Sequence, residues 1–118
     1  MVDSHEYLVG SKLPDFRCLN DEGNLVTSQD IHGKWTVMFF YPKDESPGCT
    51  LQSCSFRDRY DQFIEQGILL YGVSSDSVKS HKRFKKRYKL QYSLLSDKGG
   101  LLAEALKLKK DFGFLRAR

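Results

Sequence analysis

The chain has 118 residues, of which 40% are hydrophobic and 29% are charged, so we expect one domain, spanning residues 1–118, with a single core. Its 19 basic residues are offset by 15 acidic ones, and this balance excludes a strongly basic nucleic-acid-binding tail. The first residues lack a signal or transit pattern, and no apolar run reaches membrane-spanning length. We therefore expect a cytoplasmic protein with reduced thiols.

Three cysteines, Cys18, Cys49 and Cys54, are an odd number for a framework of structural disulfides. Reactive thiols, a metal site or simple burial remain as explanations. Cys18 lies in a first predicted strand that begins at Phe16, turns at residues 20–24 and returns through residues 25–27 as a hairpin. We expect Cys18 to be a small buried side chain rather than a catalytic one.

Residues 36–41 form a continuous apolar run, typical of a strand that is buried on both faces of a sheet. Pro42 ends that run, and the pair Ser46-Pro47 predicts a helix N-cap followed by the first helical residue. Cys49 then falls in the first turn of the helix, where free N–H groups and the helix dipole favour a thiolate.

Cys54 follows Cys49 by five residues, which places the two Cα atoms on the order of 8–9 Å apart in an intact helix. A disulfide tolerates at most about 7 Å between Cα atoms. If these two cysteines form a bond, the first turns of the helix must therefore unwind.

The predicted helix continues to about Gln66, and Gly67 ends it. Its apolar positions share one face: Phe56, Tyr60, Phe63 and Ile64. A second buried strand over residues 68–74 follows, so the strand, helix and strand predict a parallel βαβ unit.

Ser77 predicts the cap of a further helix that runs to Tyr88 and has a narrow apolar stripe made of Val78, His81, Phe84 and Tyr88. Its other face is basic, and we expect it to be solvated rather than bound to nucleic acid. A short strand over residues 92–95, a turn over 96–100 and a helix over 101–106 complete the predicted elements.

The spacing Pro42-x-x-x-Ser46-x-x-Cys49 resembles the active-site signature of peroxiredoxins, in which the serine position is usually threonine. The longer string from Phe39 to Asp58 resembles the bacterioferritin-comigratory-protein or Q-type branch of that family, as does the segment Ser80-His81-Lys82-x-Phe84. The resemblance implies a thioredoxin-like α/β fold, with a mixed central sheet and helices on both faces.

The resemblance also implies a thiol peroxidase. Cys49 would attack a hydroperoxide and become a sulfenic acid, Cys54 would capture it as a disulfide, and thioredoxin or a similar dithiol would reduce that disulfide. Ser46 would orient the peroxide or the thiolate, Pro42 would shield the thiolate from water, and Arg118 would stabilise negative charge on the reacting oxygens. No cofactor or metal is implied, because sulfur carries the electrons.

In the family, the chain continues into a strand with a catalytic arginine, a partner strand and a final helix. This sequence ends at Arg118, so we expect C-terminal strands to be missing and the sheet to be incomplete at that edge. Arg118 is by position the family's arginine, with Arg116 as the alternative. An open edge is a liability unless another chain covers it, and we expect a monomer or a weak dimer without nucleic-acid or membrane partners.

Two other classes of function compete with the peroxidase. The cysteines could bind zinc together with a histidine, but Cys-x₄-Cys is not a structural zinc spacing and the three histidines are scattered. The chain could also be a catalytically impaired peroxiredoxin remnant that acts as a redox-sensitive or interaction protein. A thioredoxin-like disulfide reductase would need Cys-x-x-Cys, which the sequence lacks.

Overall fold

The computed structural model describes residues 15–106 with their side chains and residues 113–117 as backbone. Six strands form one sheet in the order β2-β1-β5-β4-β3-β6. The strands β3, β4 and β5 run parallel, and β1, β2 and β6 pair antiparallel with their neighbours. Their bounds are β1 (Arg17–Asn20), β2 (Leu25–Thr27), β3 (Thr36–Phe40), β4 (Leu69–Ser74), β5 (Ser93–Ser96) and β6 (Gly113–Ala117).

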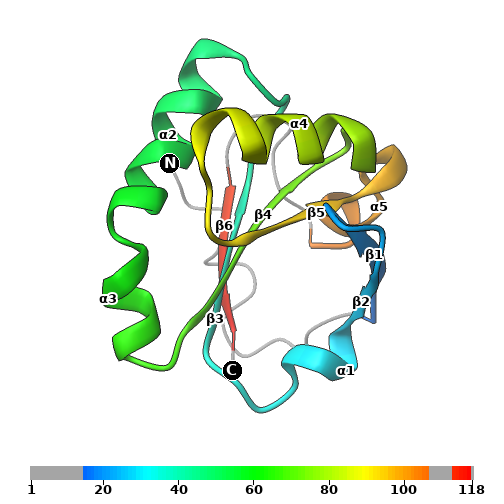
Figure 1. The fold of residues 1–118 in the computed structure, drawn as a ribbon. Coiled ribbons are helices and arrows are strands. Elements are labelled where there is room, and N and C mark those ends of the chain that lie inside the picture. Colours follow the sequence, from blue (N-terminus) through cyan, green and yellow to red (C-terminus); the bar gives the residue numbers. More distant parts are fainter. Residues whose placement is uncertain (1–14, 107–112, 118) are drawn as a thin grey trace.

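Helices cover both faces of this sheet (Figure 1). One face packs against α1 (Ser28–Ile31) and α5 (Leu101–Ala105), which follows the 3₁₀ turn η2 (Lys98–Gly100). The other face packs against α2 (Pro47–Asp58), α3 (Tyr60–Glu65) and α4 (Val78–Tyr88). The predicted mixed sheet with helices on both faces is confirmed.

The interior strand β3 contributes to two core clusters because successive side chains of a strand point to opposite faces. Met38 and Phe40 join the cluster under α1 and α5. Phe39 and Tyr41 join the cluster under α2 and α4, which also holds Cys49. The buried apolar run that the sequence predicted over residues 36–41 thus contributes side chains to both core clusters.

The local predictions agree with the structure at most elements. The hairpin pairs β1 with β2, β3 and β4 are parallel as the βαβ unit requires, and β5 and α5 follow in the expected places. Ser77 caps α4, because its hydroxyl accepts a hydrogen bond from the backbone N–H of Ser80 at 3.1 Å. The turn at Gly67 has a left-handed φ of 70°.

The single helix predicted from Pro47 to Gln66 is wrong in one respect. Arg59 leaves helical geometry, with φ −110° and ψ 9°, and separates α2 from α3. The break redirects the predicted apolar stripe, so that Phe63 packs against the core while Ile64 remains 53% exposed.

The sheet does not end at β3, because β6 pairs with β3 in antiparallel register from Phe40 opposite Gly113 to Thr36 opposite Ala117. The edge of the sheet on this side is therefore β6, and this is the edge that we expected to be incomplete. No strand after β6 lies within the described residues. Among those residues, no helix combines the length and the apolar character needed to span a bilayer.

Candidate active site

The predicted reactive segment lies at the carboxyl end of β3, where a loop over residues 41–46 leads into α2. Glu45 has a left-handed φ of 65°, which turns the chain between strand and helix and is uncommon for a residue other than glycine. Ser46 is the N-cap and Pro47 the first helical residue, as predicted. Cys49 is therefore the third residue of α2, in its first turn.

Cys49 is almost fully buried, with 1% of its surface exposed. Around it lies the cluster that joins β3 to α2 and α4, which includes Tyr41 and Phe84. The first backbone N–H groups of a helix have no partner inside the helix, so they are available to an anion at this position. A thiolate, or an oxygen anion bound to its sulfur, would find these donors beside it.

Ser46 leaves those donors free, because its side chain makes no capping hydrogen bond to the helix. Its hydroxyl instead donates to the carbonyl of Lys43 at 3.1 Å, which closes the loop on itself. Pro42 is exposed, at the outer side of the same loop. The predicted roles of Ser46 in orientation and of Pro42 in shielding stay predictions.

Cys54 is partly buried in α2, and all three cysteines in the described residues are free thiols. The helix is wound through both Cys49 and Cys54, which is the arrangement expected before any disulfide forms. Cys18 lies in the cluster on the opposite face of the sheet from Cys49. The zinc site built from all three cysteines is therefore wrong, because the sheet separates Cys18 from the other two.

Of the two candidate arginines, Arg118 lies outside the described residues. Arg116 lies in β6, where its backbone pairs with Val37 of β3. The side chain of Val37 packs against the cluster that holds Cys49. The register thus places Arg116 near the start of β3, whereas the candidate site follows the end of that strand.

A buried polar network under the loop was missed by the sequence reasoning. Asp44 accepts hydrogen bonds from the Tyr41 hydroxyl at 2.6 Å and the Ser80 hydroxyl at 2.8 Å, and the Nδ1 atom of His81 lies 2.8 Å from its Oδ2. Its backbone N–H donates to Asp76 at 2.7 Å. The one available signal was His81 itself, since a histidine within an apolar helix stripe requires a polar partner when it is buried.

The network also groups possible metal ligands, because one ligand atom each from Asp44, Asp76 and His81 lies within 4.8 Å of the others. Each of these groups already has a partner: His81 Nδ1 is bonded to Asp44 Oδ2, and Asp76 accepts from the backbone N–H of Asp44 and from the hydroxyl of Ser74. The Nε2 atom of His81 lies 2.9 Å from the Leu95 carbonyl. The arrangement is that of a satisfied hydrogen-bond network.

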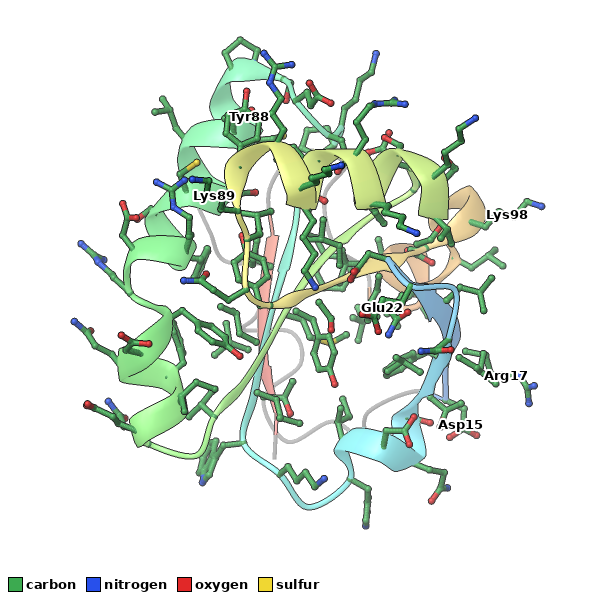
Figure 2. The ribbon with its side chains drawn as sticks, viewed as in Figure 1. Asp15, Arg17, Glu22, Tyr88, Lys89 and Lys98 are labelled. Atoms are coloured by element: carbon green, nitrogen blue, oxygen red, sulfur yellow. The ribbon has the colours of Figure 1, made fainter. Side chains whose placement is uncertain are left out.

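The far side of the sheet contains a cavity of about 500 Å³ between β1, η2 and α5, lined among others by Asp15, Arg17, Cys18 and Lys98. Figure 2 shows Asp15, Arg17 and Lys98 on the β1 side of the molecule, whereas Tyr88 marks the end of α4 that meets α2. That meeting is held by a hydrogen bond from Arg57 to the Tyr88 carbonyl at 2.9 Å. This cavity and Cys49 therefore belong to different parts of the molecule.

A mixed sheet in which an interior strand leads into a helix with a buried cysteine in its first turn forms a candidate thiol-based site. The chain belongs to the AhpC/TSA family, whose model matches residues 9–118. It is 45% identical over 96 residues to the putative peroxiredoxin bcp of Coxiella burnetii and 44% identical over 108 residues to peroxiredoxin Bcp of Bacillus subtilis. These alignments cover 81% and 89% of this chain, and 64% and 69% of those proteins.

Two solved structures are similar to it in fold. Peroxiredoxin Q of Xanthomonas campestris has a TM-score of 0.75 and 35% identity, covering 78% of this chain and 59% of that one. BcpB of Mycobacterium tuberculosis has a TM-score of 0.76 and 30% identity, covering 85% and 68%. The thioredoxin-like fold and the resemblance to the bacterioferritin-comigratory or Q-type branch are confirmed. The chain thus covers between 59% and 69% of the length of these four proteins.

Proposed function

We propose that the protein is a thiol-dependent peroxidase that reduces hydrogen peroxide and organic hydroperoxides. The observation that carries this proposal is the position of Cys49 in the first turn of α2, after the interior strand β3, in a chain of the AhpC/TSA family. One related structure, of the Xanthomonas campestris bacterioferritin comigratory protein, is described by its alkyl peroxide reduction activity. That activity supports the same substrate class here.

In the first step, the Cys49 thiolate attacks the terminal oxygen of the hydroperoxide. The O–O bond breaks, the sulfur is oxidised to a sulfenic acid, and the leaving oxygen takes a proton and departs as water or an alcohol. Helix N–H groups around Cys49 and the hydroxyl of Ser46 stabilise the charge on the reacting oxygens, and Pro42 limits the access of water. The arginine role stays with Arg118, or with Arg116 as the alternative.

In the second step, the thiol of Cys54 attacks the sulfenic sulfur, a disulfide forms and water leaves. This bond requires α2 to unwind. Three buried oxygens in that part of the helix lack a hydrogen-bond partner, which lowers the cost of unwinding: Thr50 Oγ1, Gln52 Oε1 and Ser53 Oγ. Unwinding is opposed by a hydrogen bond that the Tyr92 hydroxyl donates to the Ser53 carbonyl at 2.8 Å.

In the third step, an external dithiol reduces the Cys49–Cys54 disulfide and is itself oxidised to a disulfide. We propose thioredoxin or a similar protein as this reductant and the cytoplasm as the location, with no cofactor. A monomer or a weak dimer suffices, because both proposed cysteines come from one chain.

The experiment is intact-mass measurement of the reduced protein before and after stoichiometric hydrogen peroxide, with alkylation and peptide mapping. We expect rapid loss of two hydrogens, mapped to a Cys49–Cys54 disulfide. C54S should instead stop at a sulfenic acid, C49S should not react, and C18S serves as the matched control that behaves like the wild type. Slow oxidation, or a bond to Cys18, would contradict the proposal.

The match covers 64% of the Coxiella burnetii protein, so we also consider a second function. A catalytically impaired remnant would retain peroxide reactivity at Cys49 but would not turn over with a reductant. Steady-state consumption of peroxide in the presence of a dithiol reductant distinguishes the two functions.

A further inference from the structure

The loop that leads to Cys49 is attached to α4 through a buried ion pair. The side chain of Asp44 is 2% exposed and that of His81 is fully buried, and their Oδ2 and Nδ1 atoms lie 2.8 Å apart. Asp44 lies in the loop between Phe40 and Ser46, and His81 is the fourth residue of α4. A buried pair of this kind resists separation, because breaking it leaves a charge without a partner.

The geometry determines the protonation of His81. Its Nε2 atom lies 2.9 Å from the Leu95 carbonyl, which can only accept, so Nε2 carries a hydrogen. Its Nδ1 atom faces the Asp44 carboxylate, which already accepts from Tyr41 and Ser80. A second hydrogen on Nδ1 completes this set, so His81 is an imidazolium beside a carboxylate.

A second attachment holds the next residue of the loop. Glu45 adopts the left-handed backbone conformation, which costs on the order of 1 kcal/mol for a residue with a Cβ. Its carboxylate meets two arginines of α4, Arg87 at 2.8 Å and Arg83 at 3.7 Å. Asp44 and Glu45, the two residues before the N-cap of α2, are thus both tied to α4.

We propose that His81 is a positioning residue for the active-site loop: as an imidazolium between Asp44 and the Leu95 carbonyl, it holds the loop and the first turn of α2 in the arrangement in which Cys49 reacts. The effect on Cys49 rests on the proposed function. His81 acts through Asp44.

The proposal makes the loop sensitive to pH. Burial disfavours the charge on His81, but the hydrogen bond and the charge of Asp44, with the Leu95 carbonyl and Asp76, raise its pKa above the ordinary value. The other side chains that face the pair are Tyr41 from the end of β3 and Ser80 from α4, both hydrogen-bonded to Asp44. Loss of the His81 proton at higher pH leaves the Asp44 carboxylate without its cation and loosens the loop.

The test measures hydrogen exchange of peptides that cover residues 41–50 in the full chain between pH 6 and pH 9, corrected for the intrinsic exchange rates. In the wild type, protection should fall by about tenfold or more as His81 titrates. In H81Q it should be low and flat with pH. H32Q is the matched control, because His32 is exposed in a turn, and should behave like the wild type.

Two further measurements keep the test decisive if H81Q does not fold. Ring chemical shifts of the wild type report whether His81 is doubly protonated at pH 7, and D44N should lower that protonation whereas D61N, at an exposed carboxylate, should not. A neutral His81 at pH 7, or protection that is flat with pH in the wild type, would overturn the proposal. If His81 had a purely structural role, protection in H81Q would be lower than in the wild type but would still change with pH as it does in the wild type.

The rate of Cys49 oxidation by hydrogen peroxide links the loop to the chemistry. We expect at least about a tenfold decrease in H81Q at pH 6, since small displacements of reacting groups have effects of this size. If the wild type is not oxidised at all, the proposed function fails, yet the exchange and chemical-shift data still decide the role of His81. If the wild type is oxidised and H81Q equals H32Q in rate and protection, only the positioning role fails.

Discussion

Cys18 and Cys49 are both almost fully buried, yet they lie in different surroundings. Cys18 lies in β1, on the face of the sheet under α5, and burial together with the charge of Asp97 raises the pKa of its thiol to about 11. Cys49 lies at a helix N-terminus, where backbone donors favour an anion. The two thiols therefore differ in their expected reactivity, because they lie in different secondary-structure elements.

We therefore expect Cys18 to resist modification in the folded protein. At pH 8, a thiol with a pKa near 11 is ionised to only about one part in a thousand, and the thiolate is the reactive form. Timed alkylation with iodoacetamide followed by peptide mapping should label Cys18 last, and should label it quickly only in urea. Labelling of Cys18 ahead of Cys54 in the native protein would contradict this expectation.

The two arginines near the end of the chain can be compared by the rate at which hydrogen peroxide oxidises Cys49. The resemblance assigns the charge-stabilising role to Arg118, so we expect R118Q to slow peroxide oxidation of Cys49 by about a hundredfold, as for loss of one such donor. R116Q is the matched comparison and should behave like the wild type, because Arg116 pairs with Val37 near the start of β3, whereas Cys49 follows the end of that strand. A slow R116Q with a normal R118Q would instead support the assignment to Arg116.

At this scale, the sequence predicted the residues whose roles depend on near neighbours. The N-cap Ser46, the first-turn Cys49 and the buried Cys18 all follow from local patterns, and the structure has them in these places. The partner of His81 could not be predicted in this way, because Asp44 lies 37 positions away and meets it only after β3 and α4 pack together.

At the scale of elements, the strands and most helix ends could be predicted because their signals lie within the element. The break at Arg59 could not, because Tyr60 and Phe63 continue a helical apolar pattern through it. The direction of α3 is decided by packing on β4 and by the cluster around Phe39, which are distant in sequence.

Gly72 in β4 shows how closely one element approaches the next. A Cβ at this position would lie 2.8 Å from Cδ2 of Leu94 and 2.9 Å from Cζ of Phe39. We expect G72A to lower the free energy of unfolding by about 1–3 kcal/mol, the usual cost of overpacking, as measured by urea denaturation. The double variant G72A/L94A should cost less than the sum of the single changes, because L94A removes one of the clashing atoms.

G33A is the control for this prediction. The added methyl at Gly33 meets open space, so its cost is only that of the left-handed backbone, about 1–2 kcal/mol. No coupling with L94A is expected there. A G72A protein as stable as the wild type would mean that β4 and β5 can move apart at little cost.

At the scale of the whole molecule, the sheet order could not be read from the sequence. β6 comes last in the chain but lies beside β3, on the opposite side from β4, so that the strand before Cys49 has a neighbour on each side (Figure 1). The resemblance to a known family gave the mixed sheet with helices on both faces, and hydrophobic periodicity gave the parallel pair of β3 and β4, but neither gave the order of the strands.

Global stability should depend on pH through the same buried histidine. The pKa of His81 is raised in the folded state, so the folded protein binds its proton more tightly than the unfolded chain does, whose histidine titrates near about 6.5. This stabilisation is fully present below that value and is lost as pH rises through the folded pKa. The slope from one group cannot exceed about 1.4 kcal/mol per pH unit.

Urea denaturation at pH 6, 7, 8 and 9 measures this loss. The free energy of unfolding should decrease over that range in the wild type and in parallel in H32Q. In H81Q it should be lower at pH 6, because Asp44 remains buried without its cation, and the decrease with pH should be smaller. A wild type that gains stability from pH 6 to pH 8 would show that the folded pair of His81 and Asp44 binds fewer protons than the unfolded chain does, so that His81 is neutral beside an ionised Asp44.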